Sequence, residues 1–227
     1  MTHHTPPEAV AERVRETVLL GPSSFRLDRP ADPDLFDHPA VRAAYAADGH
    51  LPYWAELWPA ARMLAKAVLA EPWDRYPEPR HAVEVACGLG LAGIAALSRG
   101  LRVTFTDIDA LAVEYAAGNA RLNGYRDFAT GVLDVRHPPP GLRADILLGS
   151  DLLYEPRLVA PVVAFLAGAL TPGGVALIAD PDRQAARPFA DACRAAGLAV
   201  EATFARAGSP GGGRVKGSMY RITKPVG

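Results

Sequence analysis

The residues with the clearest potential for chemistry lie between positions 82 and 107, in the stretch AVEVACGLGLAGIAALSRGLRVTFTD. Three glycines spaced as G-x-G-x-x-G (Gly88, Gly90 and Gly93) separate two acids, Glu84 and Asp107. Glycines let a backbone pass close to a ligand, and a helix that follows them offers unpaired N–H groups at its start. An acid at the tip of the next strand can hold ribose hydroxyls. The stretch therefore predicts a nucleoside-binding turn.

Glu84 favours one class of ligand over another. The glycine spacing and Asp107 also fit a dinucleotide fold that binds NAD. A carboxylate inside the first strand, just before the glycines, suits a ligand that carries a cation and repels a pyrophosphate. S-adenosylmethionine (SAM) carries an ammonium and a sulfonium, so we expect SAM as cofactor and S-adenosylhomocysteine as its product. A glycine turn without a ligand is the third interpretation.

The elements that must position these residues alternate along the chain. We predict buried strands over residues 82–86, 101–106, 128–135, 144–149 and 175–179, and helices over residues 60–69, 91–97, 109–123, 157–170 and 183–196. Residues 171–174 are expected to form a turn and residues 209–216 a basic loop between two final strands, 198–205 and 218–223. The pattern predicts an α/β, Rossmann-like fold. We expect a mostly parallel seven-stranded sheet with an antiparallel C-terminal edge strand and helices on both faces.

Several polar residues follow the predicted strands directly. Asp107, Asp134 and Asp151 come at or after three strand ends, and Tyr154 follows Asp151 by three positions. Ligands of open α/β sheets bind at the carboxyl ends of the strands, so we expect these residues to form one site with Glu84. An alternative for Asp151 and Tyr154 is a helix N-cap followed by a packing aromatic residue.

The N-terminal part carries the most aromatic segment of the chain, residues 51–58. Its two tryptophans and its tyrosine are either core anchors or the roof of a ligand pocket. Before it, residues 10–27 are expected to contain a short helix or strand, and residues 41–48 two helical turns. We therefore predict a partly helical N-terminal extension (1–50) that caps the site, followed by one domain (51–227).

Composition excludes several function classes. The chain has 227 residues, is 49% apolar and has a formal net charge of −1, which gives no electrostatic case for a nucleic-acid or membrane partner. The two cysteines, Cys87 and Cys193, lack the spacing of a metal site. His3 and His4, on a loose terminus, are expected to be solvated. We predict a cytoplasmic monomer without a metal.

Three motifs resemble those of class I SAM-dependent methyltransferases, and the resemblance covers residues 51–227. Residues 84–90 look like their SAM loop, with Ala86 where many members have another glycine. Residues 151–154 match the D-x-x-Y motif of the seven-β-strand protein-lysine methyltransferases called methyltransferase family 16. Residues 52–59 look like the P-Y-W-x-x-x-W-P segment of the branch that includes the electron-transfer flavoprotein β-subunit lysine methyltransferase.

The resemblance implies a role for each matching residue. Trp58 would flank SAM, Glu84 would face its methionyl amino group directly or through water, and Asp107 would bind the ribose hydroxyls. Asp134 would approach the adenine amine, although Val135 stands where many members have a tryptophan. The predicted cofactor-binding set is completed by Ala86, Cys87, Gly88, Gly90, Ile108 and Ser150, and the predicted catalytic pair is Asp151 and Tyr154.

The resulting functional hypothesis is the N-methylation of a lysine side chain on a protein substrate. The electron-transfer flavoprotein β subunit is the first candidate partner by resemblance. The main alternative is a small amine or pyridine acceptor, since some relatives are nicotinamide N-methyltransferase-like. An NAD-dependent oxidoreductase and a catalytically silent SAM-fold binding module are more distant alternatives.

Overall fold

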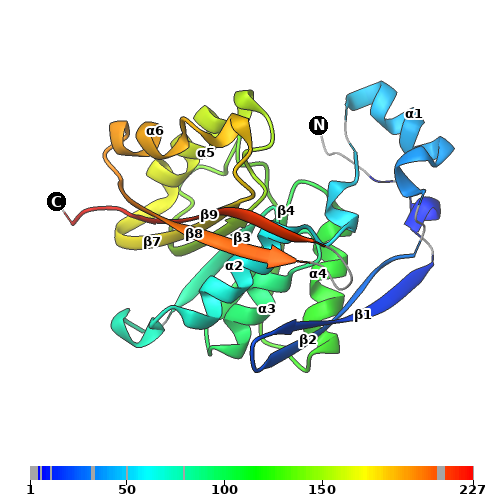
Figure 1. Cartoon of the computed structure of the whole chain (residues 1–227), viewed down its shortest axis with the longest axis horizontal. Coiled ribbons are helices and arrows are strands. Elements are labelled where there is room, and N and C mark those ends of the chain that lie inside the picture. The colour runs from blue at the N-terminus through cyan, green and yellow to red at the C-terminus, as the bar shows by residue number, and fades with distance from the viewer. Residues whose placement is uncertain are drawn as a thin grey trace.

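The computed structural model describes residues 5, 7–10, 12–31, 34–49, 51–78, 80–208 and 213–226. A twisted seven-stranded sheet forms the centre of the molecule (Figure 1). In chain order its strands are β3 (His81–Val85), β4 (Arg102–Asp107), β5 (Ala129–Val132), β6 (Ala144–Ser150), β7 (Leu170–Asp180), β8 (Ala199–Gly208) and β9 (Arg214–Thr223). Their order across the sheet is β5-β4-β3-β6-β7-β9-β8.

The sheet is parallel from β5 to β7, and β9 pairs antiparallel with both β7 and β8. The antiparallel C-terminal strand is thus present as expected, but it lies one place in from the edge, which β8 forms. From β3 the chain first winds outward through β4 and β5 and then returns to place β6 on the other side of β3. This reversal creates a switch point between the carboxyl ends of β3 and β6, where α/β proteins bind their ligands.

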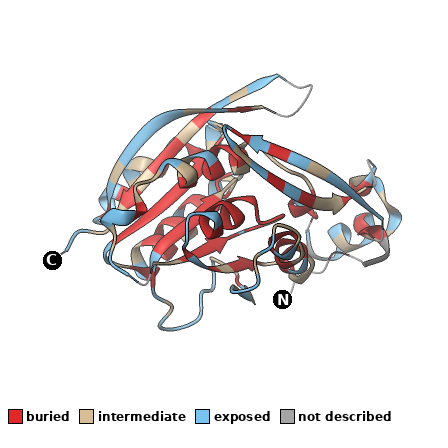
Figure 2. Ribbon diagram, turned by 90° about the horizontal axis from the view of Figure 1, so that it is seen from below, coloured by how far each residue is buried: buried red, intermediate tan, exposed pale blue. Residues whose placement is uncertain are grey.

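Helices cover both faces of the sheet (Figure 1). On one face α2 (Pro59–Ala70), α3 (Leu91–Ser98) and α4 (Ala110–Leu122) share a hydrophobic core, and on the other α5 (Pro156–Ala169) and α6 (Phe189–Ala195) share a second one. Buried residues accordingly line the central strands, whereas the edge strand β8 is largely exposed (Figure 2). Helices α2 to α5 begin within one residue of their predicted starts, with Pro59 at the start of α2 and Asp109 capping α4.

Four predictions need correction. The predicted turn at 171–174 is part of β7, which starts at Leu170 beside Ala144, with a register shift before Ile146. The predicted helix 183–196 is divided at Pro188 into a 3₁₀ turn (Gln184–Ala186) and α6, because proline lacks the N–H that a helix interior requires. The strand predicted over 128–135 is only Ala129–Val132. Arg214 and Lys216 belong to β9, not to a loop, while 209–212 lie outside the described residues.

The N-terminal region forms a β-hairpin and a helix. Strands β1 (Arg13–Leu20) and β2 (Ser23–Pro30) pair antiparallel around Gly21, whose φ of 62° suits a tight turn, and α1 (Pro39–Asp48) follows. The inward side chains of the hairpin join the core of α2, α3 and α4, with Val18 and Leu27 fully buried. The N-terminal region therefore shares one core with the rest of that face. Of the short helix or strand expected within 10–27, the structure has strands, and the helical turns expected at 41–48 are confirmed.

Candidate active site

The glycine turn after β3 has an unusual backbone. Ala86, Gly88 and Gly90 all have positive φ (48°, 49° and 80°), so every second residue turns the chain sharply before α3 begins at Leu91. Gly93 meets a different requirement, since a Cβ there would lie 2.3 Å from the Phe105 ring and 2.5 Å from the Glu84 carboxylate. The third glycine of the motif thus makes room for a buried acid beneath the helix.

Glu84 and Asp107 are both buried, and neither forms an ion pair with a basic side chain of the described residues. The Glu84 carboxylate accepts a hydrogen bond from the Gly93 N–H (2.9 Å) at the start of α3. The Asp107 carboxylate accepts from the N–H groups of Gly88 (3.0 Å) and Asp109 (3.1 Å). Burial raises the pKa of Glu84 to about 8 and that of Asp107 to about 6. Two buried carboxylates without a cation fit a ligand that brings positive charge and hydroxyl groups, as SAM does, and disfavour a pyrophosphate.

Glu84 should make the ligand-free protein less stable as the pH rises. Its folded-state pKa of about 8 exceeds its ordinary value of 4.5, so its stabilising contribution is present below pH 4.5 and is lost as the pH rises through 8. Glu84→Gln keeps an oxygen that accepts from Gly93 but cannot ionise. We expect the variant to exceed the wild type in free energy of unfolding at pH 9 by on the order of 1–3 kcal/mol, measured by urea denaturation. The exposed Glu78→Gln is the control, and parallel stability curves for wild type and Glu84→Gln between pH 5 and 9 would contradict the prediction.

Asp109 is a site residue that the sequence analysis missed. Its carboxylate caps α4 through the Leu111 N–H and also accepts hydrogen bonds from the indole of Trp54 (3.0 Å) and from the backbone N–H (3.1 Å) and hydroxyl of Thr5. The backbone of Trp54 in turn covers the glycine turn, with its carbonyl oxygen 3.4 Å from where a Cβ of Gly88 would lie. The spacing of Asp107 and Asp109 is the signal in the sequence that could have pointed to Asp109. Its partner Thr5, however, lies 104 residues away in the chain.

A second missed residue, Asn119 on α4, joins the hairpin to the glycine turn. Its amide nitrogen donates to the carbonyl oxygens of Asp28 and Leu89 (both 3.0 Å), and its amide oxygen accepts from the Asp28 N–H (2.7 Å). Asn119 is buried and lies about one turn before the C-terminal end of α4. Its hydrogen bonds therefore tie β2 to the loop that we expect to bind the cofactor.

The aromatic residues of segment 51–58 lie in two different surroundings. Trp54 is buried against Tyr115, with ring centroids 4.9 Å apart, and so anchors the core. Tyr53 is exposed and packs against three other rings, those of Phe36 (5.8 Å), Trp58 (6.2 Å) and Tyr154 (5.8 Å). The Trp58 indole donates to the Tyr53 carbonyl oxygen (2.6 Å). We call Phe36, Tyr53, Trp58 and Tyr154 the aromatic rim; it joins the N-terminal region to the D-x-x-Y motif.

Ser150 and Asp151 lie at the end of β6, the strand next to β3 at the switch point. Asp151 has a φ of 57°, and its N–H donates to the Ala179 carbonyl oxygen on β7 (3.0 Å). Helix α5 starts at Pro156 with Glu155 at its N-cap position, so Asp151 is not its N-cap. Tyr154 is 47% exposed and packs on the Tyr53 ring at the surface. The helix-cap part of the alternative interpretation of the D-x-x-Y motif is therefore wrong.

The remaining predicted cofactor residues lie along the same edge of the sheet. Cys87 follows Glu84 by three residues, and Ile108 directly follows Asp107. The Cys87 N–H donates to the Thr106 carbonyl oxygen (2.9 Å). Asp134 lies just beyond β5, and its neighbour Leu133 donates to the Asp107 carbonyl oxygen (2.8 Å). Burial favours the neutral form of Asp134, but hydrogen bonds from Arg136 (2.9 Å) outweigh it and lower its pKa. The Asp134 carboxylate is thus already engaged, which weakens its assignment to the adenine amine.

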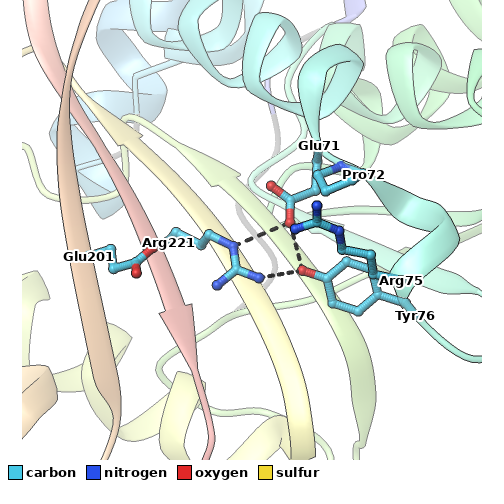
Figure 3. Close-up of a pocket in the computed structure, with 6 residues that line it drawn as sticks. All are labelled: Glu71, Pro72, Arg75, Tyr76, Glu201 and Arg221. Carbon is cyan, nitrogen blue, oxygen red and sulfur yellow. Dashed lines mark hydrogen bonds and ion pairs between the residues drawn. The ribbon is translucent and has the colours of Figure 1, made fainter.

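Two hollows in the described surface lie elsewhere. One, of about 450 Å³, is lined by Glu71, Pro72, Arg75, Tyr76, Glu201 and Arg221 (Figure 3). Three of these side chains bond one another, since Arg221 donates to the Tyr76 hydroxyl (2.6 Å), which itself donates to Glu71 (2.6 Å). The other, of about 470 Å³, lies at the amino ends of β3 and β4. Neither contains a residue of the predicted site.

The described residues contain no group of three or more His, Cys, Asp or Glu placed to hold a metal ion. None of their helices is long and apolar enough to cross a membrane.

The strand order, the switch point and the glycine turn with its two buried acids define a class I methyltransferase fold. Solved structures agree on the fold. A putative RNA methyltransferase from Pyrococcus horikoshii matches with a TM-score of 0.62 and 18% identity, covering 76% of this chain and 90% of that one. The ribosomal protein L11 methylase of Lactobacillus delbrueckii matches with a TM-score of 0.57 and 19% identity over 73% and 79% of the two chains.

Within that class, the sequence model of the lysine methyltransferase family matches residues 52–189, and the chain belongs to this family. Among curated relatives, the ribosomal protein L11 methyltransferase of Shewanella woodyi is 36% identical over 37% of this chain and 29% of its own length. The electron transfer flavoprotein beta subunit lysine methyltransferase of Danio rerio is 31% identical over 58% and 51%. The chain thus spans between about a third and a half of the length of these relatives.

Proposed function

We propose that this protein is a SAM-dependent methyltransferase that methylates the side-chain amine of a lysine on a protein substrate. The observation that carries the proposal is the position of Asp151. Asp151 directly follows β6, the strand that lies next to β3 with its glycine turn, and Tyr154 of the same motif belongs to the aromatic rim. Membership of the lysine methyltransferase family supports the same acceptor.

The cofactor would lie across the carboxyl ends of β3 and β4. Asp107 would accept hydrogen bonds from the ribose hydroxyls, since each of its oxygens has a second lone pair beyond its backbone bond. Glu84 would attract the methionyl amino group, and Trp58 would flank the cofactor at the rim. When bound, SAM supplies an electrophilic methyl group on a sulfonium.

The acceptor must arrive with a free lone pair. A lysine amine at its reference pKa costs about 4.6 kcal/mol to deprotonate at pH 7, and a nearby sulfonium reduces that cost by disfavouring the ammonium. Asp151 would accept a hydrogen bond from an N–H of the amine and so direct its lone pair at the methyl carbon. As the N–C bond forms, the C–S bond breaks and its electron pair stays on sulfur, while the extra proton on nitrogen passes to solvent. Alignment of this kind is worth on the order of 7–11 kcal/mol.

The aromatic rim suits a side chain that reaches in from a second protein. Tyr53 and Tyr154 are 45% and 47% exposed, and aromatic faces attract cations. We also propose that the N-terminal region caps the site at the aromatic rim, because Phe36 belongs to the rim and the Thr5 N–H donates to Asp109, just after β4. Two protein partners are suggested by the relatives' names, the electron-transfer flavoprotein β subunit and ribosomal protein L11. A small amine acceptor is the main rival.

Incubation with tritiated SAM separates these acceptors. The purified enzyme is mixed with a lysate of its own source, and in parallel with each of the two purified candidate proteins, and the products are separated on a gel. We expect a discrete labelled protein band that Asp151→Asn removes, with methyl-lysine found on hydrolysis of the band. Label recovered only in the small-molecule fraction would overturn the protein substrate in favour of the small amine.

A further inference from the structure

Arg183, which lies outside the predicted site, bridges the tips of two strands. Its Nη1 is 2.6 Å from Oδ1 of Asp151 at the end of β6 and 3.3 Å from Oδ2 of Asp180 at the end of β7. Its backbone N–H donates to the other oxygen of Asp180 (2.8 Å). Asp180 therefore fixes Arg183 at two points, and Arg183 holds Asp151.

The carboxylates in this chain of contacts are removed from water. The Asp180 side chain is fully buried, and the Asp151 side chain is 15% exposed. Neither oxygen of Asp151 accepts a hydrogen bond from a donor of the described residues, so its contact with Arg183 is an ion pair. Burial raises the pKa of Asp151, the Arg183 guanidinium opposes the rise, and the like charge of Asp180 adds to it. The next acid, Asp182, bonds the Ser218 hydroxyl (2.6 Å). Among the described residues, Arg183 is the cation that offsets this negative charge at Asp151.

We propose that Arg183 is a positioning residue for methyl transfer: it keeps the Asp151 carboxylate ionised and aimed at the acceptor amine, with Asp180 as its anchor. The inference rests on the role proposed above for Asp151. An ionised Asp151 accepts an N–H of the amine and leaves the nitrogen lone pair free. A protonated Asp151 instead donates its O–H to that lone pair and blocks the attack.

The Arg183 side chain can be changed without opening the core. It is 28% exposed and lies in the loop between β7 and the 3₁₀ turn Gln184–Ala186. Arg183→Gln removes the charge but keeps a long polar side chain and the backbone N–H that bonds Asp180. Arg183→Lys keeps the charge. Arg187→Gln, an exposed arginine four residues further on, is the matched control.

The first measurement follows the Asp151 carboxyl group itself. Ligand-free protein labelled with ¹³C at the aspartate carboxyl carbons is titrated by NMR, and the Asp151 signal is assigned as the one that Asp151→Asn removes. We expect Arg183→Gln to raise the titration midpoint by about one pH unit or more, Arg183→Lys to restore most of it, and Arg187→Gln to leave it unchanged. An unchanged midpoint in a folded Arg183→Gln protein would overturn the inference. If that variant does not fold, Arg183→Met, which also removes the charge, is titrated instead, and an unchanged midpoint in that folded protein overturns the inference equally.

The second measurement tests the consequence for catalysis. At the titration midpoint of the wild type, a rise of one pH unit leaves about a tenth of Asp151 ionised instead of half. Arg183→Gln should therefore lower kcat about fivefold at that pH and regain activity at higher pH, with an unchanged dissociation constant for S-adenosylhomocysteine. A pH-independent loss that Arg183→Lys does not rescue would mean a merely structural role and contradict the proposal. A shifted NMR midpoint together with a wild type that labels no protein would instead refute the lysine acceptor while leaving the Arg183–Asp151 coupling intact.

Discussion

Asp151→Asn is expected to lower kcat for methyl transfer by about 10²–10³-fold while the dissociation constant for S-adenosylhomocysteine changes by less than about threefold. The asparagine has the size of the aspartate and tolerates the positive φ of 57° at this position, which alanine does not. The variant therefore removes the charged acceptor without straining the backbone. Single-turnover kinetics with tritiated SAM and calorimetric titration with S-adenosylhomocysteine measure the two quantities.

A matched control for this experiment exists on the neighbouring strand end. Asp182 also has a positive φ (58°), is exposed and bonds Ser218 instead of the site. Asp182→Asn should leave kcat within about twofold, because an amide oxygen can still accept from the Ser218 hydroxyl. Parallel losses of transfer and of cofactor affinity in Asp151→Asn would place Asp151 in the cofactor site and not beside the acceptor.

Asp107→Ala is expected to weaken S-adenosylhomocysteine binding by at least about a hundredfold. Two hydrogen bonds from ribose hydroxyls to a carboxylate are worth roughly 1.5–3 kcal/mol each, and the variant also releases the N–H groups of Gly88 and Asp109 that shape the turn. In thermal denaturation, wild type with the ligand at about 100 times its dissociation constant gains about 2.7 kcal/mol, and the variant at the same concentration gains almost none.

Two comparisons make the Asp107 result specific. Asp134→Ala should have a smaller effect, since Arg136 already engages that carboxylate, and the exposed Asp127→Ala should have none. NAD should not shift the melting curve of the wild type. Stabilisation by NAD but not by S-adenosylhomocysteine would refute the assignment of the cofactor, and an Asp107→Ala protein that binds like the wild type would refute the role of this residue.

The local parts of the site follow from the sequence alone. A glycine turn needs residues that accept positive φ, a helix start needs a cap such as Asp109, and a parallel strand ends where its apolar run ends. These are short-range requirements, so the positions of Gly88, Gly90, Asp107 and Asp151 at the carboxyl edge of the sheet could be predicted. The mostly parallel direction of the strands follows as well, because strands that alternate with helices are joined by crossover connections, which place them parallel.

Contacts between distant segments were decided only by the tertiary structure. Residues 1–50 have weak periodicity, and the hairpin in this region exists because it pairs with itself and packs on α4 through Asn119. Trp54 and Trp58 are equivalent in type and close in sequence, yet Trp54 meets Asp109 in the core and Trp58 stays at the rim.

The contact of Arg183 in the candidate active site could not be predicted from the sequence either. A helix was predicted to start at this residue, but Arg183 lies in the loop before the 3₁₀ turn Gln184–Ala186. From there its guanidinium contacts Asp151, 32 residues earlier in the chain. Sequence patterns report which residues share a face of one element, with periods of two or 3.6 residues. They do not show which side chains meet across strands, because those contacts depend on how all the elements pack together.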